Sequence, residues 1–428
     1  MRAALWFLGL FGVAVAIALF AGNNQGTITV FWPPYRIDFS LNLVVLLLAL
    51  LFFILHVALS ALAAFFAIPG HARSWRVQHQ ERAMNLALLD ALSSLVAGRF
   101  IRARKAAESV LERETAMRSN GETLVYSSRL RALTHLLAAE SAQALQDKDA
   151  REDHFKLALE ESTKRDAQET REGLQLRAAR WALEDHDPQG ALQCLKELPL
   201  GAARRTVALR LRLKAARMAR ETLLALETAR LLAKHRAFST VAAQGILRGL
   251  ALELISTAHD PEQMQFVWQQ LDTDERLMPE VAIVASSRLL QLGGDIPLSR
   301  HWVLPIWEQM LLDSNSVTHT QRVNLIRLLE NGFALATGTP DGGWLVRIEK
   351  AQMAHPGDAA LQYLAGITCM RLQLWGKAQQ LLKQALPRLK DVGLERSAWQ
   401  GLAELAEQRG DTVMAAQAWQ KAAKAGLD

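Results

Sequence analysis

The chain has 428 residues, a formal net charge of +6 and a hydrophobic content of 50%. It is long enough for a large core, while its modest, spread-out charge does not favour a nucleic-acid-binding protein. Its two cysteines, Cys194 and Cys369, lie far apart, which is typical of a reducing compartment and excludes a cysteine-based metal cluster.

Two uncharged apolar segments lie at the start of the chain, at about residues 3–21 and 41–67. As helices they would span about 28 Å and about 40 Å, so the second must tilt or project beyond the lipid. Ordinary core helices keep one face polar, and these segments do not. We therefore predict two transmembrane helices. A cleaved signal peptide is the alternative for the first, but Leu19-Phe20-Ala21 lacks the small residue that cleavage requires.

The linker between the two apolar segments alternates like a pair of strands. Residues 27–32 and 35–39 are rich in β-branched and aromatic side chains, and Pro33-Pro34 lies between them. This pattern predicts a small β-hairpin at the membrane surface, with Trp32 and Tyr35 as interfacial aromatics. An irregular loop is the alternative, since an isolated hairpin is marginally stable in water.

The flanking charges predict the orientation. Arg73, Arg76 and Arg82 follow the second apolar segment, whereas the linker carries only Arg36, balanced by Asp38. By the positive-inside rule, both termini and the large C-terminal part lie in the cytoplasm, and only the linker lies outside. The sequence thus predicts a two-pass membrane protein that contacts lipid.

Beyond Pro69-Gly70 the chain is rich in helix-forming residues, and its clearest repeated unit is the last one. Large and small side chains recur there on two helices with a turn between them: Trp399, Leu402, Ala403, Gly410, Asp411, Ala415, Trp419 and Ala422. A preceding unit has the same spacing at Gly366, Ala378 and Ala385. The pattern resembles a tetratricopeptide repeat, in which small residues let two antiparallel helices approach closely.

Weaker copies of the unit recur upstream and predict an α-solenoid. We expect three parts: residues 1–70 as the transmembrane hairpin, 71–336 as a degenerate tetratricopeptide-like array, and 344–428 as C-terminal repeats. Residues 337–343 are the most loop-like stretch and separate the last two parts. The predicted fold is therefore all-α, with two N-terminal membrane helices, a short hairpin between them, and an α-solenoid.

Signatures of catalysis are missing from the sequence. There is no GxGxxG after a strand, no Walker motif, no HExxH, no GxSxG and no CxxC pair. We therefore expect no enzyme, no metal site and no catalytic residue. His56 lies in the second apolar segment, where an ionisable group suggests function, and its imidazole could ligate a haem iron. The alternative is a neutral His56 that bonds to a neighbouring helix.

The whole pattern resembles the proteobacterial HemY family. The residues that carry the resemblance are 26–30 and 35–38 in the hairpin and the segment Gly70–Trp75 after it. The resemblance is strong to about Phe100 and looser beyond. It implies an inner-membrane protein linked to late haem (protohaem IX) biosynthesis, with no catalytic residues to transfer. A flavin-dependent oxidase shares the family's name, but the dinucleotide fingerprint that it needs is absent here.

The residues themselves favour a membrane-anchored scaffold that holds partner proteins in its solenoid groove, and the resemblance implies that haem-biosynthesis enzymes are among them. No cofactor is expected, although haem is the competing hypothesis at His56. Three rival functions are a porphyrin-transfer protein, an enzyme with an unrecognised site, and an envelope-assembly adaptor. An adaptor with a rubredoxin-like module would need two cysteine pairs, and the chain has two cysteines in all.

Overall fold

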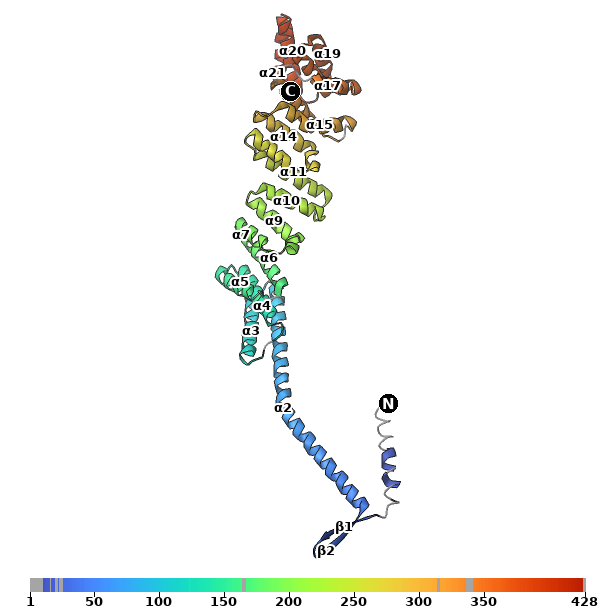
Figure 1. The fold of residues 1–428 in the computed structure, drawn as a ribbon. Coiled ribbons are helices and arrows are strands. Elements are labelled where there is room, and N and C mark those ends of the chain that lie inside the picture. The colour runs from blue at the N-terminus through green and yellow to red at the C-terminus, as the bar shows by residue number, and fades with distance from the viewer. Residues whose placement is uncertain are drawn as a thin grey trace. The chain divides into compact units, whose positions relative to one another are not determined.

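The computed structural model describes residues 11–15, 17–19, 22, 26–122, 124–163, 167–313, 316–335 and 342–425 (Figure 1). The chain divides into two compact units, Met1–Arg171 and Glu172–Asp428. Each unit is described by itself below. The described residues are mostly helical, as predicted, apart from one two-stranded sheet.

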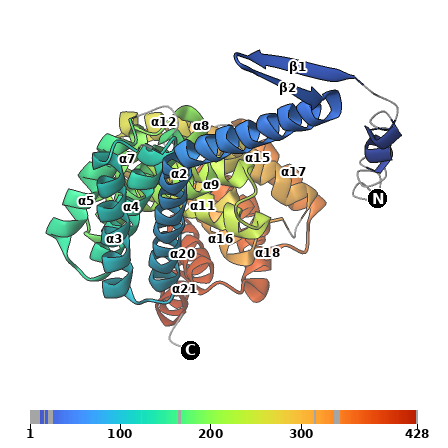
Figure 2. The same cartoon turned by 90° about the horizontal axis from the view of Figure 1, so that it is seen from below.

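The predicted β-hairpin is confirmed. Strand β1 (Thr27–Trp32) pairs antiparallel with β2 (Tyr35–Ser40), with Trp32 opposite Tyr35 and the cis peptide Pro33-Pro34 in the turn. Ser40 also caps the next helix, because its hydroxyl accepts a hydrogen bond from the Leu43 backbone N–H. The hairpin therefore leads without a linker into the long helix α2, as Figure 2 shows.

Helix α2 (Leu41–Val96) runs for 56 residues. Its stretch Leu41–Leu62 is, among the described residues, the one helical segment long and apolar enough to cross a membrane. The predicted first membrane helix lies mostly outside the described residues, where only 11–15 and 17–19 are seen, as helix. A second pass is thus not confirmed.

Helix α2 continues through Pro69-Gly70, well beyond the predicted end of the second apolar helix at about residue 67. A proline removes one intrahelical hydrogen bond and disfavours the turn before it, but neighbouring turns keep their own bonds. The residues that follow are good helix formers, so the helix continues. One helix therefore contains both the apolar stretch and the segment that packs against the next helices of the first unit.

The remainder of the first unit is built from α3 (Phe100–Ser119), α4 (Ser127–Ala144) and α5 (Lys148–Glu161). Each of these helices packs on the one before it, and α2 packs on α3 and α4. Ala91, Ala107 and Ala138 are fully buried together, one from each of α2, α3 and α4. Small side chains at this point let the three helix axes approach closely.

The second unit continues the same construction. Its helices follow one another in the order α6 (Gln168–Glu184), α7 (Pro188–Lys196), α8 (Leu200–Ala203), α9 (Thr206–Met218), α10 (Thr222–Lys234), α11 (Thr240–Ser256), α12 (Pro261–Gln270), α13 (Thr273–Arg276), α14 (Pro279–Gln291), α15 (Ile296–Leu312), α16 (His319–Leu335), α17 (Gly342–Ala354), α18 (Ala359–Arg371), α19 (Trp375–Ala385), the 3₁₀ turn η2 (Leu386–Arg388), α20 (Val392–Gln408) and α21 (Thr412–Lys424).

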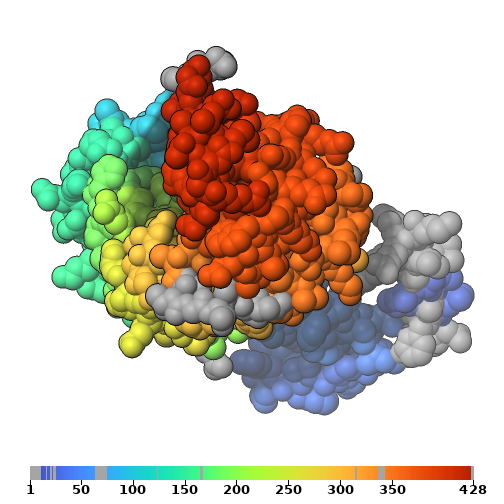
Figure 3. All heavy atoms as spheres, turned by 90° about the horizontal axis from the view of Figure 1, so that it is seen from above, coloured from blue at the N-terminus to red at the C-terminus, as the bar shows by residue number. Residues whose placement is uncertain are grey.

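Helices α11, α14, α16, α18 and α20 contact one another in that order and form one layer. Helices α12, α15, α19 and α21 each pack beside a member of this layer. We call the first set the inner layer and the second set the outer layer. A single core runs through the pairs from Ala216 to Ala418, and Figure 3 shows the last pairs, in orange and red, as one packed body. Nearest-neighbour stacking of helix pairs is the defining feature of an α-solenoid.

One turn recurs between paired helices and explains the degenerate repeats. It places a residue at positive φ, as at His186 and Gly410, and the next backbone N–H then bonds to the carbonyl five residues earlier. Asp187 and Asp411 follow at once, and each side chain caps the next helix. Because glycine is absent from several of these turns, the repeat is hard to recognise from sequence.

Candidate functional site

His56 lies on α2 within the apolar stretch Leu41–Leu62, and its side chain is exposed. Among the described residues, no group of three His, Cys, Asp or Glu side chains could hold a metal ion. A haem site needs an apolar pocket as well as an axial ligand. His56 on an exposed helix face supplies only the ligand, so these residues alone do not form a haem site.

The predicted repeat positions mostly form the contacts between helices. Most of them are buried: Gly366, Ala378, Ala385, Leu402, Ala403, Ala415 and Ala422. Gly410 has φ +74° in the turn, and Asp411 caps α21 by accepting from the Met414 backbone N–H. Two positions differ, since Trp399 is half-buried and Trp419 is exposed and donates to Glu407. These two tryptophans therefore do not fill the helix interface completely.

Gly366 shows why a small residue is needed there. A Cβ atom at this position would lie 2.9 Å from both Cγ and Cδ2 of Leu382 on α19, and 3.3 Å from its backbone nitrogen. Leu382 is fully buried and cannot swing away. The close contact of α18 with α19 therefore depends on the glycine.

A pocket of about 490 Å³ lies among the last helices. Its lining includes the apolar side chains of Trp399, Leu402, Met414 and Ala418 and the charged side chains of Lys383, Glu395 and Lys421. The Lys421 ammonium is 4.4 Å from the centre of the Trp399 ring, a cation–π distance. Sequence patterns do not reveal this pocket, because its lining comes from four separate elements.

A groove of about 490 Å³ crosses three consecutive inner-layer helices. We call it the inner groove, and its lining residues come from α11, α14 and α16: Leu252, Ile255, Ser256, Ile283, Val284, Ser287, Arg288, Gln291, Asn324, Arg327, Leu328 and Asn331. On α14 and α16 these residues follow the same helical spacing of three, four and seven. The stack thus places one face of each helix in the groove.

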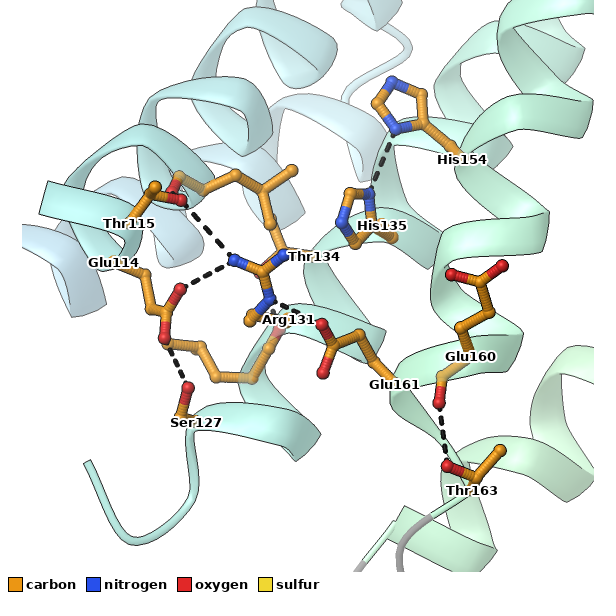
Figure 4. A network of polar contacts seen from close by, with 12 residues as sticks. Glu114, Thr115, Ser127, Arg131, Thr134, His135, His154, Glu160, Glu161 and Thr163 are labelled. Atoms are coloured by element: carbon orange, nitrogen blue, oxygen red, sulfur yellow. Dashed lines mark hydrogen bonds and ion pairs between the residues drawn. The ribbon is translucent and has the colours of Figure 1, made fainter. Parts of the chain in front are cut away.

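A polar network in the first unit connects α3, α4 and α5 (Figure 4). The Arg131 guanidinium on α4 donates to Glu114 on α3 at 2.8 Å and to Glu161 on α5 at 2.9 Å. Both carboxylates are largely buried, so the arginine compensates two charges that would otherwise be costly. No sequence motif marks these residues, because they come from three helices.

His135 lies beside this network. Its Nδ1 atom is 3.1 Å from Nδ1 of His154 on α5, the distance of a hydrogen bond between two neutral rings. Burial lowers the pKa of His135 to about 4, and the neighbouring His154 and Arg131 act in the same direction. Burial also lowers the pKa of His154. The pair is therefore a neutral, packed contact at pH 7.

The fold and its grooves define a helical-repeat protein of the α-solenoid class, with an apolar membrane-length helix in its first unit. Residues 26–146 match the family described as HemY protein N-terminus. The chain thus carries a HemY N-terminal domain, which confirms the predicted family.

Two solved structures match most of the chain at low similarity. The crystal structure of the APC/C hetero-tetramer Cut9–Hcn1 has a TM-score of 0.28 and 14% identity, and the match covers 80% of this chain and 66% of that one. The structure of Naa15/Naa10 bound to HypK-THB has a TM-score of 0.25 and 13% identity, covering 79% and 60%. The chain spans less than two thirds of either, and scores this low support no functional argument. No curated protein matches the sequence.

Proposed function

We propose that the chain is a membrane-anchored scaffold that binds partner proteins at the cytoplasmic face of a bacterial inner membrane. The partners would act in late haem biosynthesis, and the chain itself would not be an enzyme. The observation that carries the proposal is the inner groove, which crosses three stacked helices and contains unused hydrogen-bonding side chains on two of them, α14 and α16. The HemY N-terminal domain supports the association with haem biosynthesis.

The apolar stretch Leu41–Leu62 supports the anchor. The hairpin aromatics Phe31, Trp32 and Tyr35 are exposed at its turn end, and the opposite end, at Ser40, leads into that stretch; exposed aromatics are typical of a membrane interface. Anchoring concentrates the groove near membrane-associated partners, so modest affinities become sufficient. The arginines at 73, 76 and 82 favour a cytoplasmic location for the repeats.

A haem or porphyrin carrier is the second candidate, and His56 is the observation that favours it. An ionisable side chain within an apolar stretch is often functional. The two candidates make opposite demands on this residue. A carrier needs the imidazole as a ligand, whereas a scaffold needs only a helix that remains inserted.

The deciding experiment substitutes His56→Ala in the full-length protein and returns it to cells that lack the protein. We expect normal haem content and an unchanged membrane level of the variant. Leu55→Ala is the matched control, since it shortens the neighbouring exposed side chain. Loss of haem content in His56→Ala alone, with the protein still present in the membrane, would overturn the scaffold in favour of the carrier.

A further inference from the structure

Four neutral polar side chains of the inner groove are not used by the fold. Ser287 and Gln291 on α14, and Asn324 and Asn331 on α16, make no hydrogen bond to any residue that the structure describes. Three of these side chains, those of Gln291, Asn324 and Asn331, are exposed. Amide side chains both donate and accept hydrogen bonds, as a peptide backbone does. The groove is therefore equipped to bond to a main chain.

The spacing of these groups suits an extended segment. Asn324 and Asn331 are seven residues apart, so they lie on one face of α16, two turns from each other. Ser287 and Gln291 occupy the same face of α14, one turn apart. Three neighbouring helices at 8–10 Å spacing extend over roughly 20 Å, which an extended peptide of about six residues covers.

The charged side chains that line the inner groove are all positive. Its lining contains Arg288 and Arg327 and no carboxylate. The Arg288 guanidinium donates to the Ala258 carbonyl oxygen at 2.9 Å, which fixes its position without neutralising it. Arg327 pairs with Asp391 at 2.7 Å, so its charge is partly compensated. Positive potential in a groove of neutral amides favours an acidic ligand.

The exposed part of the lining is mostly polar. Among its large apolar side chains, Val284 is the one that is substantially exposed, at 40%. An amphipathic helix binds through a continuous apolar groove, whereas an extended peptide needs backbone partners and a few side-chain pockets. The groove matches the second mode.

We propose that the inner groove binds an extended, acidic peptide segment of a partner protein. The backbone of that segment bonds to Asn324, Asn331 and Gln291, its carboxylates lie near Arg288, and an apolar side chain contacts Val284. This inference rests on the proposed scaffold function and names the chemistry that the scaffold recognises.

The test uses the full-length protein in detergent micelles and a displayed library of random linear peptides of twelve residues. We expect the enriched peptides to contain more Asp and Glu than the input library. Their affinity, measured by fluorescence anisotropy, should fall with added salt because the charge contribution is screened. It should fall about tenfold or more in the double variant Asn324→Ala with Asn331→Ala, because each amide loses hydrogen bonds to the peptide.

The matched control is Gln269→Ala with Gln309→Ala, which removes two exposed amides from α12 and α15 of the outer layer. It should leave affinity unchanged. Enrichment of basic or uncharged peptides, no enrichment at all, or equal affinity for the Asn324→Ala/Asn331→Ala variant would each overturn the acidic-peptide groove. The scaffold function itself fails separately, if no protein partner is crosslinked to the repeats in cells.

Discussion

The contact of α18 with α19 gives the sharpest stability prediction. Gly366→Ala would place a Cβ atom 2.9 Å from two side-chain atoms of Leu382 and 3.3 Å from its backbone nitrogen. Overpacking of this kind costs roughly 1–3 kcal/mol. Against this, alanine gains about 1 kcal/mol over glycine in a helix interior. Because Leu382 is fully buried and backbone is involved, the upper part of the overpacking range applies, and the net destabilisation is about 1–2 kcal/mol.

The rate at which a thiol reagent labels Cys369 measures this destabilisation locally. This cysteine lies on α18, three residues after Gly366, and is fully buried, so a thiol reagent reaches it only when the helix opens. In a Cys194→Ala background, Gly366→Ala should label about 5–30 times faster, as 1–2 kcal/mol requires. Gly376→Ala is the control, since a Cβ there meets nothing within 4 Å. Equal labelling of the two variants would refute the close-contact argument.

The remaining predictions concern packing, pH and topology. Ala403→Trp and Ala422→Trp should each destabilise the protein by roughly 1–3 kcal/mol in thermal melts, because both alanines are buried. The exposed Glu404→Gln should be nearly neutral. Equal melting temperatures for the alanine variants and the Glu404 variant would show that the predicted repeat register is wrong. The pKa of His135 in the folded protein is about 4, below its ordinary value of 6.5. The contribution of this neutral, buried ring to the free energy of unfolding is therefore complete above pH 6.5 and is lost as the pH falls from 6.5 towards 4. His135→Asn should flatten the fall in melting temperature across that window, and an unchanged pH profile would contradict this reasoning. In intact cells, a thiol reagent that does not cross membranes should label Asp38→Cys and not Arg99→Cys; the reverse pattern would place the repeats outside.

Several elements could be predicted because their signal is local. The hairpin follows from alternation on both sides of Pro33-Pro34, and the apolar stretch of α2 follows from composition alone. The C-terminal repeats could be recognised because Gly366, Ala403 and Ala422 must be small for their helices to pack. In each case, one short segment contains the pattern and its physical cause.

Features that depend on distant residues left no local pattern. The continuation of α2 through Pro69-Gly70 was missed because a helix breaker only raises the cost of a helix, and packing further along decides the outcome. The inner groove combines Gln291 with Asn331, and neither lies in a motif. The His135–His154 pair joins two helices, and its burial could not be known before they were placed.

Photocrosslinking in living cells tests the central claim most directly. A photoreactive amino acid replaces Gln291 in the inner groove of the full-length protein, and in a second variant it replaces Gln269 on the outer layer. We predict discrete adducts with specific proteins from position 291, including an enzyme of late haem biosynthesis, and none from position 269. Adducts from position 269 alone, or none from either variant in membranes that contain the protein, would contradict a scaffold that binds its partners in the inner groove.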